Sequence, residues 1–228
     1  DASSRFTKPG QLPYRCLNWN GRLIRRDGTS KQVSLNPEKP SRINYSLNLK
    51  LHENGKLTGK VRKQFTDQLA YNYRVKMANV NEEKYIDDLK NDLDVEITEH
   101  TKDNVDNLVQ PIVETFSFTK EKGFDQINDK IYFSPLSFLA IKENPFKQDR
   151  KERNFPINFT YPKSQRMMIN IDIPEGYSIE YMPEKTAVAL PDNAGVFRYN
   201  INQSTSGAIQ VVIQKDINQP IFAAEFYE

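Results

Sequence analysis

The chain has 228 residues, of which 37% are hydrophobic and 11% aromatic, and its formal net charge is +2. This composition is too aromatic for a disordered chain and too polar for a membrane protein, and the near balance of charge gives no support to nucleic-acid binding. No apolar run reaches the roughly 18 residues of a membrane span, and no signal-peptide pattern opens the chain. A single cysteine excludes an internal disulfide and a cysteine-based zinc site.

Two β-hairpins are predicted in the first third of the chain. Alternating runs on either side of Asp27-Gly28 indicate a hairpin at about 22–36, because both turn residues tolerate positive φ. The prolines of "PEKPS" at 37–41 follow it and suggest a boundary. A longer alternation surrounds Asn54-Gly55 and predicts two strands with one buried face. The apolar positions of this second hairpin are Ile43, Tyr45, Leu47, Leu49, Leu51, Leu57, Val61 and Phe65.

Two short helices are predicted next, because the apolar period changes from two residues to about four after Thr66. Leu69, Tyr73 and Met77 lie four residues apart and indicate a helix at about 67–78. Asn81, followed by two glutamates, is typical of a helix N-cap and predicts a second helix at about 82–91.

The remainder of the chain returns to strand signals. We expect strands at 94–98, 112–118, 130–134, 156–161, 167–173, 177–183, 186–190, 195–201 and 208–214. Many short strands separated by Pro, Gly and Asn turns are typical of a β-sandwich. The predicted fold is therefore mainly β, α+β overall: antiparallel hairpins with a short two-helix insertion, followed by a C-terminal β-sandwich-like domain. We expect three regions, at 1–36, 37–140 and 141–228.

A thiol-based catalytic triad is the first candidate site, because the chain contains one cysteine, Cys16, two histidines, His52 and His100, and begins at Asp1. A cysteine nucleophile needs an imidazole base and an orienting carboxylate, usually with the thiol at a helix N-terminus. Cys16 lies between a proline turn and a predicted strand instead. His52 falls at a hairpin tip, and His100 follows a strand in an acidic region. We expect these residues not to form a catalytic set.

Carboxylates offer two further candidates. Ten of them lie between Glu82 and Asp106, but a calcium loop counted from Asp92 needs glycine where Ile97 stands, so a strand with a solvated acidic face is the favoured interpretation. Glu175, Glu180 and Glu184 surround predicted turns and could act as an acid and base pair in glycoside cleavage. Acidic surface turns without chemistry are the alternative that we favour.

Aromatic residues raise the question of a binding surface. The stretch "KENPFKQDRKERNFPINFTYP" interleaves cations and aromatics, as single-stranded nucleic-acid sites do. Its acidic residues reduce the net charge to +2, so we interpret it as a mixed-charge loop whose aromatics anchor it to the core. We also expect the single tryptophan, Trp19, to pack at the entry to the first hairpin. Exposed aromatics would instead favour carbohydrate binding.

Several spaced motifs resemble one protein family. The opening "DASSRFTKPGQLPYRCLNWNGRLI" is similar to the end of the transglutaminase-like core in large exported proteins of Bacteroidetes-type bacteria, where an Asp-Ala-Thr segment precedes "LP", "R-C-L-N" and a "G-R-L-I"-like strand. The later motifs "NPFKQDRKERNFPINFTYP" and "IPEGYSIEYMPE" resemble the C-terminal domain of unknown function of the same proteins. The resemblance covers most of the chain.

The resemblance implies a role for residue 1. The family's triad runs Cys, His, Asp, and Asp1 would be the last member, with Ser3 where the family often has Thr. The matching Cys and His would lie upstream, and Cys16 matches a non-catalytic position. Region 1–36 would then be the edge of the transglutaminase-like core.

The expected function is that of a noncatalytic accessory region, for binding or scaffolding, in an exported transglutaminase-like protein. Its expected partner is the upstream domain of the same protein, with an envelope protein or a glycan as a further partner, in the periplasm or cell envelope. No cofactor or metal is indicated. Two alternatives stay open: a part of an active Cys-His-Asp transamidase or protease completed upstream, and a carbohydrate-binding module.

Overall fold

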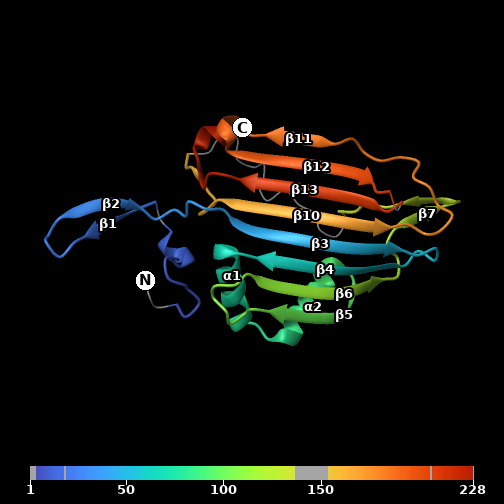
Figure 1. Ribbon diagram of the computed structural model, residues 1–228, viewed down its shortest axis with the longest axis horizontal. Coiled ribbons are helices and arrows are strands. Elements are labelled where there is room, and N and C mark those ends of the chain that lie inside the picture. The colour runs from blue at the N-terminus through green and yellow to red at the C-terminus, as the bar shows by residue number, and fades with distance from the viewer. Residues whose placement is uncertain (1–3, 18, 137–153, 206, 228) are drawn as a thin grey trace.

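The computed structural model describes residues 4–17, 19–136, 154–205 and 207–227 (Figure 1). One eight-stranded sheet dominates it. Two helices and several small elements complete the fold. The sheet strands are β3 (Ser41–Leu51), β4 (Leu57–Phe65), β5 (Glu96–Asp103), β6 (Ile112–Lys120), β10 (Lys163–Asp172), β11 (Thr186–Ala189), β12 (Gly195–Gln203) and β13 (Ile209–Ile217). The helices are α1 (Asp67–Ala78) and α2 (Glu82–Leu93).

Smaller elements surround this sheet. They are η1 (Tyr14–Cys16), β1 (Asn20–Ile24), β2 (Ser30–Ser34), β7 (Asp125–Ile127), β8 (Lys130–Tyr132), β9 (Ile157–Asn158), η2 (Pro191–Asn193), β14 (Ile221–Phe222) and η3 (Ala224–Tyr227). Three two-stranded sheets form among them, β1-β2, β7-β8 and β14-β9. Figure 1 shows β1 and β2 projecting from one end of the molecule, with β7 at the opposite end.

The order of strands in the large sheet is β11-β12-β13-β10-β3-β4-β6-β5. All neighbours are antiparallel except β10 and β3, which are parallel and join the N-terminal and C-terminal halves of the sheet. Leu47 stands opposite Ile169 at this junction, and both side chains are fully buried. On the opposite face, the Asn170 side chain donates to Asn48 at 3.0 Å and accepts from Gln210 at 3.2 Å. The junction is thus tied on both faces.

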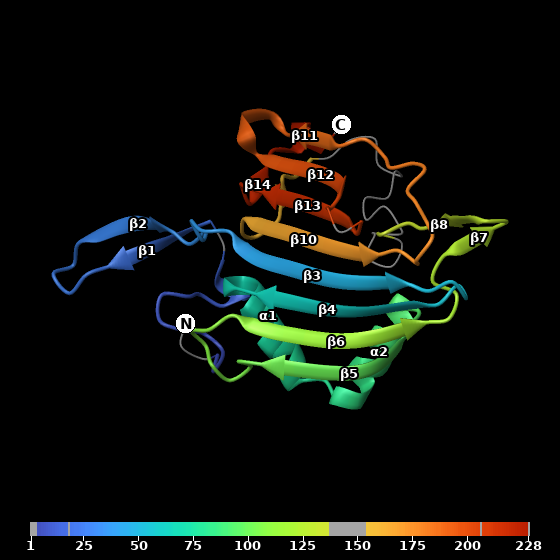
Figure 2. The same cartoon turned by 45° about the vertical axis from the view of Figure 1, so that its right-hand side comes forward.

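Both helices cover the inner face of only one half of the sheet, formed by β3, β4, β6 and β5 (Figures 1 and 2). We call this the covered half, and β10, β13, β12 and β11 the open half. The covered half follows from alternation: Leu47, Val61 and Phe116 stand in one row across β3, β4 and β6 and are all buried. Burying each such side chain stabilises the fold by about 1.5–3 kcal/mol.

Polar side chains fix the start of each helix. The Thr66 hydroxyl accepts the Arg42 backbone N–H at 3.0 Å, which ties the first turn of α1 to β3. The Asn81 side chain accepts the Glu83 backbone N–H at 2.8 Å, so it caps α2 as the sequence predicts. Asp94 then adopts φ +55° and ends α2.

The mainly β, α+β fold class is confirmed, as are the two helices and both antiparallel hairpins. Two details differ from the sequence prediction. The strands after 163 do not build a separate sandwich. They extend the central sheet through β10, because β10 finds its partner in the free edge of β3. Residues 177–183 alternate in polarity but form no strand, because alternation reports sidedness and not the presence of a pairing partner.

Candidate functional site

The structure separates the residues of the suspected triad. Cys16 ends η1, whereas His52 follows the far end of β3, and that eleven-residue strand alone spans about 36 Å. The ring of His52 bonds Thr58 at 2.9 Å. His100 lies within β5, with its ring centroid 5.8 Å from that of Tyr85 on α2, and Asp1 lies outside the described residues. The triad hypothesis therefore gains no support from this arrangement.

A buried carboxylate organises the covered half. Glu114, on the inward face of β6, is fully buried. Its Oε1 accepts hydrogen bonds from Tyr85 at 2.6 Å, His100 Nε2 at 3.1 Å and Tyr73 at 3.2 Å. Its Oε2 lies 3.0 Å from the Lys63 ammonium. We call these five residues the Glu114 cluster. They come from β4, α1, α2, β5 and β6, so one carboxylate fixes both helices to three strands.

Electrostatics keep this carboxylate ionised. Burial by itself would raise the pKa of Glu114, but the hydrogen bond from His100 and the charge of Lys63 outweigh burial and lower its pKa to about 2. Burial and the Glu114 charge together raise the pKa of Tyr73 and of Tyr85, so both phenols stay protonated and donate. The cluster is thus a carboxylate that accepts hydrogen bonds from two neutral phenols and an imidazole through Oε1 and forms an ion pair with a cation through Oε2.

The Glu114 cluster is suited to support rather than to catalysis. All five side chains are enclosed between helices and sheet, and none of them lines the cleft described below. The second nitrogen of His100 faces the Glu82 carboxylate at 3.8 Å, and Glu82 pairs with Lys102 at 2.8 Å. Sequence reasoning did not identify this cluster. One signal for it was present, since Glu114 shares the inward positions of β6 with Ile112, Phe116 and Phe118.

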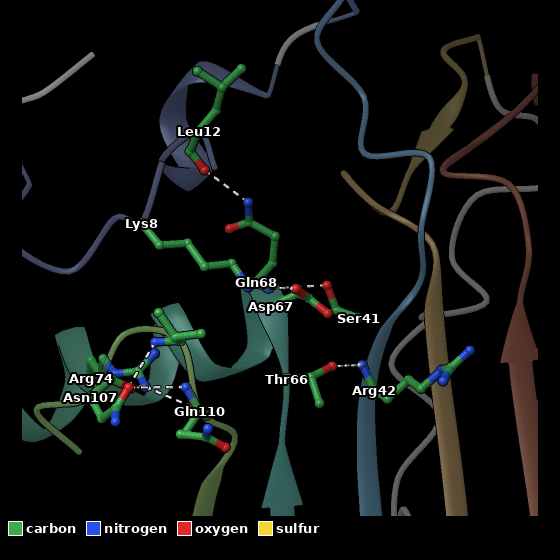
Figure 3. A network of polar contacts seen from close by, with 11 residues as sticks. Lys8, Leu12, Ser41, Arg42, Thr66, Asp67, Gln68, Arg74, Asn107 and Gln110 are labelled. Atoms are coloured by element: carbon green, nitrogen blue, oxygen red, sulfur yellow. Dashed lines mark hydrogen bonds and ion pairs between the residues drawn. The ribbon is translucent and has the colours of Figure 1, made fainter. Parts of the chain in front are cut away.

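An N-terminal arm, residues 4–17, is fastened to the start of α1 (Figure 3). The Gln68 side chain donates to the Leu12 carbonyl at 2.8 Å, and the Gln68 backbone N–H donates to the buried Ser41 hydroxyl at 3.1 Å. Lys8 pairs with Asp67 at 3.1 Å. The Thr160 hydroxyl donates to the Tyr14 hydroxyl of the same arm at 3.1 Å. The arm therefore reaches the sheet at a fixed position.

Arg74 holds the loop between β5 and β6 against α1. Its guanidinium, on α1, donates to the backbone carbonyls of Val105 at 2.7 Å and Asn107 at 2.6 Å, and more weakly to Asn104 and Gln110 (Figure 3). Arg74 is 3% exposed, and burial lowers its pKa. The loop between β5 and β6 thereby closes against α1.

The β1-β2 hairpin, in contrast, is bare. Eight of its ten strand residues are exposed, and the other two, Gly21 and Val33, are half-buried. Trp19 at its entry is 48% exposed, so the prediction that it packs is wrong for this chain. Ile24 is 71% exposed, and the hairpin carries four basic residues against a single aspartate. Exposed apolar side chains and an excess of basic side chains therefore lie on the same hairpin.

A cleft of about 1310 Å³ opens at the end of the molecule opposite the hairpin. Its floor is the inner face of the open half, including Ile171, Tyr199 and Ile201. Its walls are formed by residues 129–136, 173–174 and 176–184. Of the suspected glycosidase carboxylates, Glu180 and Glu184 reach this cleft, and Glu175 does not line it. Glu180 is paired with Lys130 at 2.8 Å, so it contributes to the rim as half of an ion pair.

Residues 142–153 of the basic and aromatic stretch lie outside the described residues. Downstream, Phe159 packs edge-on against Phe222 with 5.6 Å between ring centroids, and Tyr161 is buried, whereas Phe155 is exposed.

Within the described ranges, no group of three His, Cys, Asp or Glu side chains could hold a metal ion. Neither described helix has both the length and the apolar character needed to cross a membrane.

Residues 129–228 match a known family. It is described as a "Domain of Unknown Function with solved-structure structure (DUF3858)". The matched stretch contains all four strands of the open half and every cleft-lining residue except Leu51 and Asp125. A comparison with curated proteins gives no match. The similarity to DUF3858 therefore coincides with the open half and its cleft.

Proposed function

We propose that this chain is a noncatalytic accessory region of an exported transglutaminase-like protein. In this proposal the β1-β2 hairpin packs against the upstream domain of the same protein in the cell envelope, and the sheet is the body that it joins. The observation that carries the proposal is the hairpin itself, which leaves Trp19, Leu23 and Ile24 exposed.

An isolated hairpin of this kind is unfavourable. Two strands alone are marginally stable in water and need a third strand or a packing partner. Leu23 and Ile24 are neighbours in β1, so their side chains point to opposite faces and neither face of the hairpin is purely polar. A partner that covers both faces would remove this apolar surface from water. Its own surface should be acidic, because the hairpin carries three more positive than negative charges.

The anchoring of the arm supports a role in holding two bodies together. Gln68, Ser41 and Lys8 fix the arm before the hairpin begins, and the Leu35 N–H bonds the Trp19 carbonyl at 2.9 Å where the hairpin returns. A partner bound to the hairpin would therefore sit in a fixed orientation relative to the sheet.

The test compares this chain with a longer polypeptide that includes the upstream residues. In the longer polypeptide we expect Ile24→Ser to lower the free energy of unfolding by about 1–2 kcal/mol, because it removes a buried apolar contact. In this chain alone the same change should stay within about 0.5 kcal/mol, as for other exposed residues. Hydrogen exchange of the amides in 20–34 should slow in the longer polypeptide.

Ile127→Ser is the matched control, since Ile127 is another exposed isoleucine in a two-stranded hairpin, β7-β8. It should have no effect in either polypeptide. Equal effects of Ile24→Ser with and without the upstream residues would contradict the proposal. So would thiol-dependent amidase or transamidase turnover by this chain alone that disappears in Cys16→Ala.

A further inference from the structure

The inner face of the open half stays partly bare beyond the cleft. Thr186 on β11 and Tyr199 on β12 stand opposite each other and both line the cleft. Side chains alternate along a strand, so Val188 and its partner Phe197 point to the same face. Val188 is 57% exposed and Phe197 is 39% exposed. An apolar strip, formed by Val188 on β11 and Phe197 on β12, therefore continues from the cleft along these two strands.

The edge of β11 offers backbone hydrogen-bonding groups. Among the described strands, β11 pairs with β12 alone. The Leu190 N–H donates to the Gly195 carbonyl at 2.9 Å, so Leu190 and, by alternation, Val188 direct their backbone groups toward β12. The N–H and C=O groups of Ala187 and Ala189 consequently face outward. The small side chains of Ala187 and Ala189 leave room for another strand beside this edge.

The cleft next to this edge is acidic. Asp125, Asp129, Glu180 and Glu184 line it, and Lys130 is the single cation among its lining residues. Lys130 is already paired with Glu180. The remaining carboxylates favour a basic group at the end of β11 that begins with Thr186.

We propose that β11 and the cleft together bind an extended polypeptide segment, which adds to β11 as a further strand. Alternate apolar side chains of the segment cover Val188 and Phe197, and a lysine or arginine at one end of it lies among the cleft carboxylates. This mode of recognition takes its affinity from main-chain hydrogen bonds and its specificity from alternate side chains. The site is remote from the β1-β2 hairpin and does not depend on the function proposed above.

A glycan is the competing class of ligand, since Tyr132 and Tyr181 are exposed at the cleft. The outward backbone groups of β11 and the adjacent Val188 and Phe197 favour a polypeptide, because a sugar has no repeating backbone that matches a strand edge. The experiment therefore distinguishes the two ligand classes by comparing a peptide with an oligosaccharide.

The probe is a fluorescein-labelled ten-residue peptide in which valine alternates with threonine and a lysine pair flanks each end. Binding to the full chain is followed by fluorescence anisotropy. A peptide with glutamates in place of the lysines and a chitin-derived hexasaccharide are the comparison ligands. We expect the lysine peptide to bind, the glutamate peptide to bind at least about threefold more weakly, and the hexasaccharide not to compete.

Two pairs of variants locate the site. Ala187→Pro removes an outward N–H and should weaken binding by about fivefold to tenfold, whereas Ala187→Val keeps the N–H and should change it by less than about twofold. Glu184→Lys should weaken binding by about threefold or more, whereas Glu175→Lys, outside the cleft, should not. Circular dichroism checks that each variant folds, and the two surface glutamate variants keep the test valid if Ala187→Pro does not. Absence of peptide binding, binding indifferent to both pairs, or displacement by the hexasaccharide would overturn the proposal.

Discussion

The two halves of the sheet bury their inner faces in different ways. In the covered half, α1 and α2 enclose Leu47, Val61 and Phe116, and even a carboxylate is fully buried there. In the open half, Ile169 and Val211 are buried next to the junction, but exposure rises toward β11, where Val188 is mostly solvent-accessible. The same alternating pattern thus gives a buried core from β6 through β13 and an exposed surface at the edge strand β11. Coverage by another element, and not strand sequence, decides the difference.

The Glu114 cluster, with its fully buried carboxylate, belongs to the covered half alone. Glu114→Ala should lower the free energy of unfolding by about 3–5 kcal/mol, because Lys63 and His100 would lose a buried partner. Denaturant unfolding followed by circular dichroism measures the effect. Glu114→Gln keeps the shape and two hydrogen-bond positions and should cost less. A loss below about 1 kcal/mol for Glu114→Ala would mean that the cluster does not hold the helices to the sheet.

A pair of apolar truncations compares the halves directly. Leu47→Ala, in the fully buried part of β3, should cost about 2–5 kcal/mol, because it removes buried contacts and leaves a cavity. Val188→Ala, at the inner face of β11, should stay within about 0.5 kcal/mol. Chemical denaturation of each variant measures both changes in the free energy of unfolding. Similar costs at the two positions would show that the strip on β11 is covered in solution.

Acid should weaken the covered half selectively. The pKa of Glu114 is lowered to about 2 from an unfolded value of 4.5, so its contribution is present above about pH 4.5 and is lost as the pH falls toward 2. The loss amounts to at most about 3 kcal/mol. Unfolding free energies measured from pH 6 to pH 2 should fall more steeply in the natural sequence than in Glu114→Gln. Parallel pH profiles would remove Glu114 as the cause.

The sequence predicted local features well and assembled features poorly. Asn54-Gly55 and the four-residue spacing of Tyr73 and Met77 are short-range signals, and both elements form as predicted. The Glu114 cluster draws one residue from each of five elements, so its existence depends on strand register and helix docking that no local pattern contains. The prediction that Trp19 packs is wrong, because its burial depends on a neighbouring surface and not on the residue type at the hairpin entry.

The cleft was predictable only in part. Glu180 and Glu184 were singled out as candidates, and the structure places both at its rim. Their setting was not foreseen, because it requires β7 and β8 to bring Lys130 beside Glu180 and the segment 177–183 to remain unpaired. Alternation in that segment predicts a strand, whereas in the structure all of residues 177–183 line the cleft.

The parallel pairing of β10 with β3 has a consequence for synthesis of the chain. Partners across this junction are separated by 122 residues, as for Asn48 and Asn170. At roughly 5–20 residues per second, a ribosome needs about 6–24 s to deliver β10 after β3 has emerged. Throughout that interval, β3 exposes an unpaired edge beside the apolar Leu47 and Leu49. The nascent chain is therefore most prone to association before residue 163 appears, and chaperone demand should end once β10 has docked.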